Sequence, residues 1–148
     1  MTARNTSEKK IRILVVDDEP DIRLVIAKGL EAEGFVVESS GDPEVVNKTF
    51  KKDMYDLVLL DIKMPKMSGF ELFREIKKKD PQVRVCFITA FEIYFDEFKK
   101  VFPKIHVSCF IRKPATIKQL SEAVRAELSR PELEEEGETP RAAGHVKR

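Results

Sequence analysis

Five short apolar runs alternate along this chain with segments in which apolar residues recur at helical spacing. The first run, "IRILVV" at 11–16, is short and rich in β-branched residues, which is typical of a strand buried on both faces of a sheet. Strands that alternate strictly with helices form a parallel sheet, with right-handed crossovers and with helices on both faces. The expected fold class is therefore α/β. The predicted strands cover residues 11–16, 35–40, 57–60, 83–89 and 107–111.

Helix signals occupy the intervals between these strands. The clearest helix begins after Thr116, which has the pattern of a capping box with Gln119 and is followed by an apolar stripe. Asp42 followed by Pro43 has the form of an N-cap with proline at the first helical position. The remaining expected helices run from Pro20 to before Gly34, from Pro43 to about Lys52, through Phe70, Phe73 and Ile76, and over 91–102.

The composition predicts a single folded domain with polar ends. Of the 148 residues 42% are hydrophobic, enough to bury a core, and the net charge of +1 gives no overall field that would favour nucleic acid. Residues 1–10 are polar and expected to be flexible, and residues 130–148 contain no aromatic residue and are expected to be disordered. We therefore expect one domain over 11–129, with no output domain and no direct DNA binding.

The sequence also indicates a cellular compartment. No apolar run approaches the roughly 18 residues of a membrane span, and the polar start lacks the apolar region of a signal peptide. We therefore expect a cytoplasmic protein that does not bind membranes. Cys86 and Cys109 both lie in apolar surroundings, which predicts two reduced thiols in the core rather than a redox pair.

Polar residues collect where the predicted strands end. Asp17 and Asp18 follow the first strand, Asp61 the third, Thr89 ends the fourth and Lys113 follows the fifth. In parallel α/β sheets ligands bind just beyond the carboxyl ends of the strands, so these side chains are expected on one rim. Each of them has an ordinary structural explanation when taken alone, but their arrival at one edge favours a functional site.

The residue types suggest the chemistry of this site. Three converging carboxylates repel one another and raise each other's pKa values, and a small, hard cation such as Mg²⁺ relieves that repulsion. An ionised carboxylate beside a cation can attack a phosphoryl group, and cationic and hydroxyl groups can then bind the phosphoryl oxygens. Asp61 is therefore the candidate nucleophile, with Lys113 and Thr89 as candidate phosphate-binding residues.

These residues lie within motifs that occur in a fixed order. The motifs are "ILVVDDEP" (13–20), "LVLLDIKMP" (57–65) with "SG" at 68–69, "FITA" (87–90) and "FIRKP" (110–114). Over about residues 10–129 the chain resembles the response-regulator receiver domains, the CheY-like family of two-component signal transduction. The resemblance implies a flavodoxin-like (βα)5 fold, a doubly wound five-stranded parallel sheet with strand order 2-1-3-4-5.

The resemblance also implies roles for the residues at the rim. Asp61 would accept phosphate from the phosphohistidine of a sensor histidine kinase or a histidine-phosphotransfer protein, forming an acyl phosphate. Asp17, Asp18, Asp61 and the backbone carbonyl of Lys63 would hold Mg²⁺, with Mn²⁺ as the alternative ion.

The same resemblance implies a switch rather than an enzyme that acts on a separate substrate. Thr89 and Lys113 would bind the phosphoryl oxygens, and Thr89 would move inward as the aromatic ring of Phe110 fills the space behind it. The changed surface of the helix at 91–102 and the strand at 107–111 would then bind a downstream protein.

Two further features of the sequence concern the lifetime of the phosphoryl group and the binding of a partner. In the family that the chain resembles, the positions of Lys63 and Phe91 border the path of attacking water, and the bulky Phe91 is therefore expected to give a long-lived phosphoryl group. Aromatic residues are concentrated between Phe91 and Phe110, and helical spacing makes most of them a core-facing stripe. The alternative is that Tyr94 and Phe98 extend the apolar surface and dock a partner or a second copy of the chain.

Three other functions are weighed against the switch. A phosphorylation-independent interaction module would not need the five rim residues. A flavin- or nucleotide-binding protein would need a phosphate-binding loop after the first strand, where this chain has "DDEPD". A phosphatase with an aspartate nucleophile would have a second acid two residues later, where this chain has Lys63.

Overall fold

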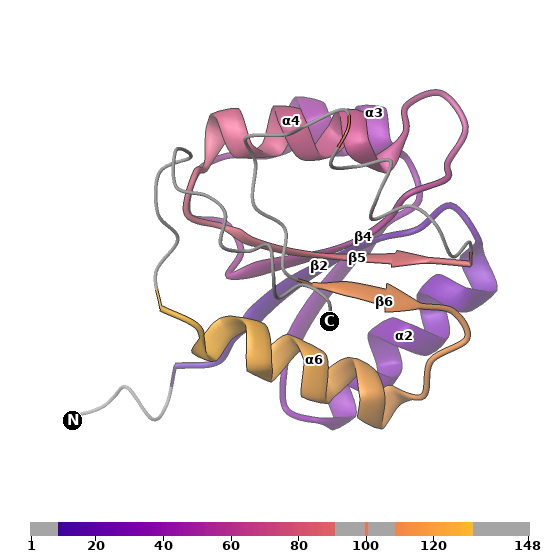
Figure 1. The fold of residues 1–148 in the computed structure, drawn as a ribbon, viewed down its shortest axis with the longest axis vertical. Coiled ribbons are helices and arrows are strands. Elements are labelled where there is room, and N and C mark those ends of the chain that lie inside the picture. Colours follow the sequence, from indigo (N-terminus) through magenta and orange to yellow (C-terminus); the bar gives the residue numbers. More distant parts are fainter. Residues whose placement is uncertain (1–8, 91–99, 101–108, 132–148) are drawn as a thin grey trace.

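The computed structural model describes residues 9–90, 100 and 109–131. Its five strands form one parallel sheet in the order β3-β2-β4-β5-β6, which is 2-1-3-4-5 counted from the N-terminus (Figure 1). The fold class and the strand order implied by the family resemblance are therefore confirmed. The strands are β2 (Arg12–Val16), β3 (Val36–Ser40), β4 (Leu57–Asp61), β5 (Arg84–Thr89) and β6 (Phe110–Arg112).

Two pairs of helices cover the two faces of this sheet. In Figure 1, α3 and α4 lie over one face, and α2 and α6 lie under the other. Their starts agree with the predicted caps, and both Ser68 and Thr116 form complete capping boxes. The predicted helix over 91–102 lies outside the described residues apart from residue 100. The described helices are α2 (Pro20–Ala32), α3 (Pro43–Thr49), α4 (Gly69–Lys79) and α6 (Ile117–Ser129).

Helix α3 ends at Thr49, about three residues before the expected end at Lys52. Phe50 has extended backbone angles, is almost fully buried, and packs its ring against Tyr55 with the centroids 5.9 Å apart. Burying a phenylalanine side chain contributes more than an additional turn of helix would at this site. The core therefore overrides the local helical pattern.

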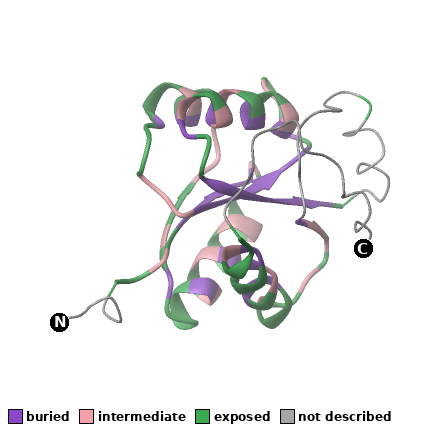
Figure 2. Ribbon diagram, turned by 60° about the vertical axis from the view of Figure 1, so that its left-hand side comes forward, coloured by how far each residue is buried: buried purple, intermediate pink, exposed green. Residues whose placement is uncertain are grey.

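The core consists of two apolar layers, one on each face of the sheet. All of β4 and β5 is buried, as Figure 2 shows for the central strands. One layer packs the sheet against Val46 of α3 and Phe73 of α4, and the other packs it against Leu30 of α2 and Val124 of α6. The predicted burial of the first strand on both faces is confirmed for residues 13–16, whereas β3 and β6 are largely exposed or half-buried.

The expectation of two reduced cysteines is wrong. Cys86 and Cys109 form a disulfide, with their Cα atoms 4.6 Å apart and a sequence separation of 23. Both lie in the predicted apolar core. The pairing arises because Cys86 lies on β5 and Cys109 directly precedes β6, opposite it in the sheet. Apolar flanking residues predict burial equally well for a thiol and for a cystine, so they did not distinguish the two.

Residues 1–8 and 132–148 lie outside the described residues, so the flexible start and the disordered tail remain predictions. Within the described part of the chain, none of the helices has the length and apolar character needed to cross a membrane.

Candidate functional site

Three carboxylates meet at the carboxyl end of the sheet. Asp61 is the last residue of β4, and Asp17 follows β2 directly, opposite Asp61 because Val16 pairs with Leu60. Asp17, Asp18 and Asp61 each offer a carboxylate oxygen within 4.8 Å of the others. Asp17 and Asp61 are buried, whereas Asp18 is half-buried. This is an oxygen-ligand cluster of the kind that a hard divalent cation binds.

The loop after Asp61 is shaped by Gly69, the first residue of α4. The backbone amide of Gly69 donates to the carbonyl of Ile62 at 2.8 Å, which brings the start of the helix against the end of β4. A Cβ atom on Gly69 would collide with main-chain atoms of Asp61 and Ile62. Only glycine allows this close approach, which explains the "SG" that follows the aspartate motif.

We expect Gly69→Ala to lower the free energy of unfolding by about 1–3 kcal/mol, because the added methyl group meets main chain that cannot move aside. Urea unfolding measures the change. Gly41→Ala is the matched control, since a Cβ there meets only the flexible end of the Arg23 side chain. Equal stability of the two variants would contradict this account of the loop.

Lys113 places one ammonium group among these carboxylates. Its Nζ lies 3.0 Å from Asp17 Oδ2, 3.4 Å from Glu19 Oε1 and 3.7 Å from Asp61 Oδ2. Its backbone amide donates to the carbonyl of Thr89 at 2.7 Å, which fixes the segment after β6 beside the end of β5. The positive charge is therefore held at the centre of the acidic cluster.

The cluster shifts the pKa values of its members. Burial raises the pKa of Asp61 to about 7, and the negative charges of Asp17 and Asp18 add to the rise. The ammonium of Lys113 and the backbone amide of Lys63, which donates to Asp61, oppose it. An additional positive charge would relieve the repulsion and ionise Asp61, as a carboxylate nucleophile requires.

The pKa of Lys113 is also raised, which for this residue favours the charged form. Burial alone would lower the pKa of Lys113, but its hydrogen bond to Asp17 and the charges of Asp61, Asp17 and Glu19 outweigh burial and raise it. The ammonium form is therefore favoured, and it remains available to bind anionic oxygens.

Thr89 and Phe110 lie on the two strands next to Asp61. Thr89 ends β5 and is buried; Asp61 pairs with Ile88, so Thr89 lies one step farther along the same edge. Phe110 is half-buried on β6, and its ring stacks on Phe87 with the centroids 5.2 Å apart. The predicted residues of the switch are thus on neighbouring strands, on the face covered by α3 and α4.

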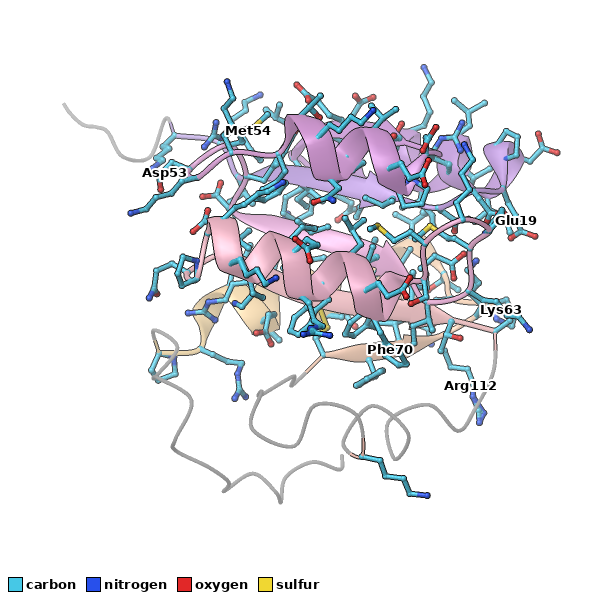
Figure 3. All side chains as sticks on the ribbon, turned by 90° about the horizontal axis from the view of Figure 1, so that it is seen from above. Glu19, Asp53, Met54, Lys63, Phe70 and Arg112 are labelled. Carbon is cyan, nitrogen blue, oxygen red and sulfur yellow. A yellow bond between two sulfur atoms is a disulfide. The ribbon has the colours of Figure 1, made fainter. Side chains whose placement is uncertain are left out.

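Two further residues contact the site: Glu19, which belongs to the acidic run after the first strand but was assigned no role, and Arg23, which sequence reasoning missed. Glu19 contacts Lys113, and Arg23 donates from its guanidinium to the backbone carbonyl of Asp17 at 2.7 Å. Figure 3 shows Glu19, Lys63 and Arg112 at the same end of the sheet, far from Asp53. Glu19 had a signal, since it extends the acidic run after the first strand, whereas Arg23 had none.

Of the remaining predicted residues, the structure describes Lys63 but not the three aromatic residues. Lys63 is exposed on the loop after β4 (Figure 3). Phe91, Tyr94 and Phe98 lie outside the described residues, so the expected effect of Phe91 on phosphoryl lifetime and the docking surface at Tyr94 and Phe98 remain predictions.

Comparisons with known proteins agree with this geometry. A family model for the response regulator receiver domain matches residues 13–125. The transcriptional regulatory protein RprY of Bacteroides fragilis is 31% identical over 123 residues, which cover 83% of this chain and 51% of RprY. The probable transcriptional regulator ycf27 of Guillardia theta is 33% identical over 123 residues, with 83% and 47% covered. The chain spans about half the length of the curated relatives it matches.

Solved structures give the same result. The response regulator TrrA of Thermotoga maritima, solved in complex with Mg(2+)-BeF, is 33% identical with a TM-score of 0.66, covering 78% of this chain and 97% of that one. A CheY-like receiver domain protein from Methanospirillum hungatei is 27% identical with a TM-score of 0.69, covering 81% and 94%. With the sheet order, the acidic cluster and these matches in agreement, the chain belongs to the family of response regulator receiver domains.

Proposed function

We propose that this receiver is a phosphorylation-controlled switch in which Asp61 is the phosphoacceptor. The observation that supports this most is the buried position of Asp61 between two further carboxylates and the ammonium of Lys113. Burying a carboxylate in this position costs folding free energy. A role in binding a cation and accepting a phosphoryl group explains why the carboxylate is placed there.

The reaction follows from these positions. A carboxylate oxygen of Asp61 attacks the phosphorus of a phosphohistidine, the phosphorus–nitrogen bond breaks, and the imidazole leaves with its electron pair and takes up a proton. The product on the protein is an acyl phosphate. Lys113 binds a phosphoryl oxygen as negative charge moves towards it, and the hydroxyl of Thr89 is the second proposed donor.

The acidic cluster fits a resident Mg²⁺ ion. Asp17, Asp18 and Asp61 supply carboxylate oxygens, and the backbone carbonyl of Lys63 is the fourth proposed ligand, with Mn²⁺ as the alternative ion. When bound, the ion supplies positive charge that offsets the carboxylates and the transferring phosphoryl oxygens. The raised pKa of Asp61 supports this assignment, because burial, with the charges of Asp17 and Asp18 added, outweighs the positive charge that Lys113 supplies.

The proposed output is a change of surface. Thr89 turns towards the phosphoryl group, and the ring of Phe110, stacked on Phe87, moves into the space that Thr89 leaves. A downstream protein, or a second copy of the chain, would recognise the altered β6 side of the domain. Lys63 and Phe91 are proposed to set the lifetime of the acyl phosphate.

The partners follow from the same proposal. We infer a sensor histidine kinase or a histidine-phosphotransfer protein as the phosphate source, and a location in the cytoplasm. The curated relatives carry the names of transcriptional regulators, but this chain spans only about half of their length. We propose that the described domain acts on its target through protein contact rather than through its own contact with DNA.

Labelling with acetyl phosphate and Mg²⁺ tests the assignment. Wild type is expected to gain one phosphoryl group by intact mass, and Asp61→Asn is expected to gain none because an amide is not a nucleophile. Asp53→Asn is the matched control, since Asp53 is exposed at the opposite end of the sheet and asparagine tolerates its positive φ of 67° (Figure 3). Labelling that survives in Asp61→Asn would overturn the assignment.

A further inference from the structure

The disulfide joins the two strands that hold Thr89 and Phe110. Cys86 lies in β5, three residues before Thr89, and Cys109 directly precedes Phe110. The backbone amide of Phe87 donates to the carbonyl of Cys109 at 2.9 Å, so the cystine stands at the first step of the contact between β5 and β6. It is a covalent bond across the part of the sheet that the phosphorylation switch uses.

Strand β6 is the element that such a bond affects most. It is an edge strand, and its ladder with β5 spans only Phe110 to Arg112, the shortest in the sheet. It nevertheless leads directly to Lys113, whose Nζ lies 3.0 Å from Asp17 and 3.7 Å from Asp61. A cross-link at the start of this short strand therefore holds the lysine of the site in place.

Both oxidation states of the pair are compatible with the core. Cys86 and Cys109 lie in the apolar layer beneath α2 and α6, with Leu120 and Val124 in the same cluster. A neutral thiol behaves as a small apolar group, so reduction removes the covalent bond without placing a charge in the core. In a cytoplasmic protein, moreover, a disulfide is usually transient and redox-sensing rather than structural.

We propose that Cys86 and Cys109 form a reversible redox modification site that sets how fast Asp61 is phosphorylated. The inference rests on the proposed function of Asp61. The disulfide fastens β6 to β5 and preorganises Lys113 beside Asp61, so the oxidised domain is the faster phosphoacceptor. Reduction leaves β6 held by its short ladder and by the hydrogen bond from the Lys113 amide to Thr89, and lets the Lys113 side chain sample other positions.

The co-reactant is a dithiol. One thiolate of the dithiol attacks Sγ of Cys109, which is 7% exposed whereas Cys86 is 0% exposed. The sulfur–sulfur bond breaks, Cys86 leaves as a thiolate and takes up a proton, and a mixed disulfide forms on Cys109. The second thiol of the reagent then displaces Cys109 and becomes oxidised to a disulfide. Two electrons and two protons thus pass from the dithiol to the protein.

The test compares the two oxidation states of the unaltered chain. Wild type is oxidised with glutathione disulfide or reduced with dithiothreitol, desalted without oxygen, and labelled with acetyl phosphate and Mg²⁺. Alkylation and mass measurement count the free thiols, with none expected in the oxidised form and two in the reduced form. We expect phosphorylation to be about fivefold faster in the oxidised form, near the lower end of typical coupling between two sites.

The Cys86→Ala, Cys109→Ala double variant is the control, and it should follow the slow rate under both treatments. Because reduced wild type carries no substitution, the comparison does not depend on how well that variant folds. Equal rates in the two oxidation states would overturn this inference and leave the proposed function standing. No labelling in either state would overturn the proposed function and the coupling with it. Two free thiols after oxidation would overturn the redox site itself.

Discussion

Replacing Arg84 by methionine is expected to lower the free energy of unfolding by about 3–5 kcal/mol, because it leaves one member of a buried ion pair without its partner. Arg84 begins β5, where its guanidinium lies 3.7 Å from the carboxylate of Glu127 on α6, and both side chains are almost fully buried. The same guanidinium donates to the backbone carbonyls of Arg130 and Pro131 at 2.9 and 3.0 Å. These carbonyls follow the end of α6, where no further turn of helix supplies donors.

Urea unfolding at pH 7 measures this loss. Lys118→Met is the matched control, because Lys118 is exposed on α6, the helix that carries Glu127, and we expect it to cost less than 1 kcal/mol. The double variant Arg84→Met, Glu127→Met should recover much of the stability, since replacing a whole buried pair by apolar residues is often neutral. An Arg84→Met variant as stable as Lys118→Met would show that the pair contributes little.

Arg84 also illustrates what the sequence could not predict. Within "VRVCFIT" the arginine reads as one polar residue in an apolar strand, and its burial depends on Glu127, 43 positions later. The disulfide was missed for the same reason, since Cys86 and Cys109 become neighbours only once β6 is placed beside β5. Local patterns predicted each strand, but not which side chains meet between them.

The site was more predictable because it depends on a rule about strand ends. Asp17, Asp61 and Thr89 each stand where an apolar run stops, and parallel strands bring such ends to one edge. The strand order that makes β2 and β4 neighbours came from the family resemblance, not from the periodicity. Contacts made from helices, such as that of Arg23 with Asp17, follow no comparable rule and had to be seen in the structure.

The charge of Asp61 gives the second large effect. In the absence of divalent cations, Asp61→Asn is expected to raise the free energy of unfolding at pH 8 by about 2–4 kcal/mol, since a pH unit of pKa shift corresponds to about 1.4 kcal/mol. Burial, with the charge of Asp17, raises the pKa of Asp61 to about 7, against about 4 in an unfolded chain. The folded wild type therefore binds this proton more tightly than the unfolded chain does. The stability that this tighter proton binding contributes is fully present below pH 4 and is lost as the pH rises through 7.

Urea unfolding in EDTA at pH 5 and pH 8 tests this sign. Wild type should lose stability between the two values relative to Asp61→Asn, whose amide does not titrate, and Asp53→Asn should follow wild type because its side chain is exposed at the opposite end of the sheet. Adding Mg²⁺ at pH 8 should raise the stability of wild type and narrow its difference from Asp61→Asn, because the cation binds the ionised cluster of the folded state. If Asp61→Asn were less stable than wild type in EDTA at pH 8, the repulsion would be too weak to explain why this carboxylate needs a cation, and the metal assignment would lose its electrostatic basis.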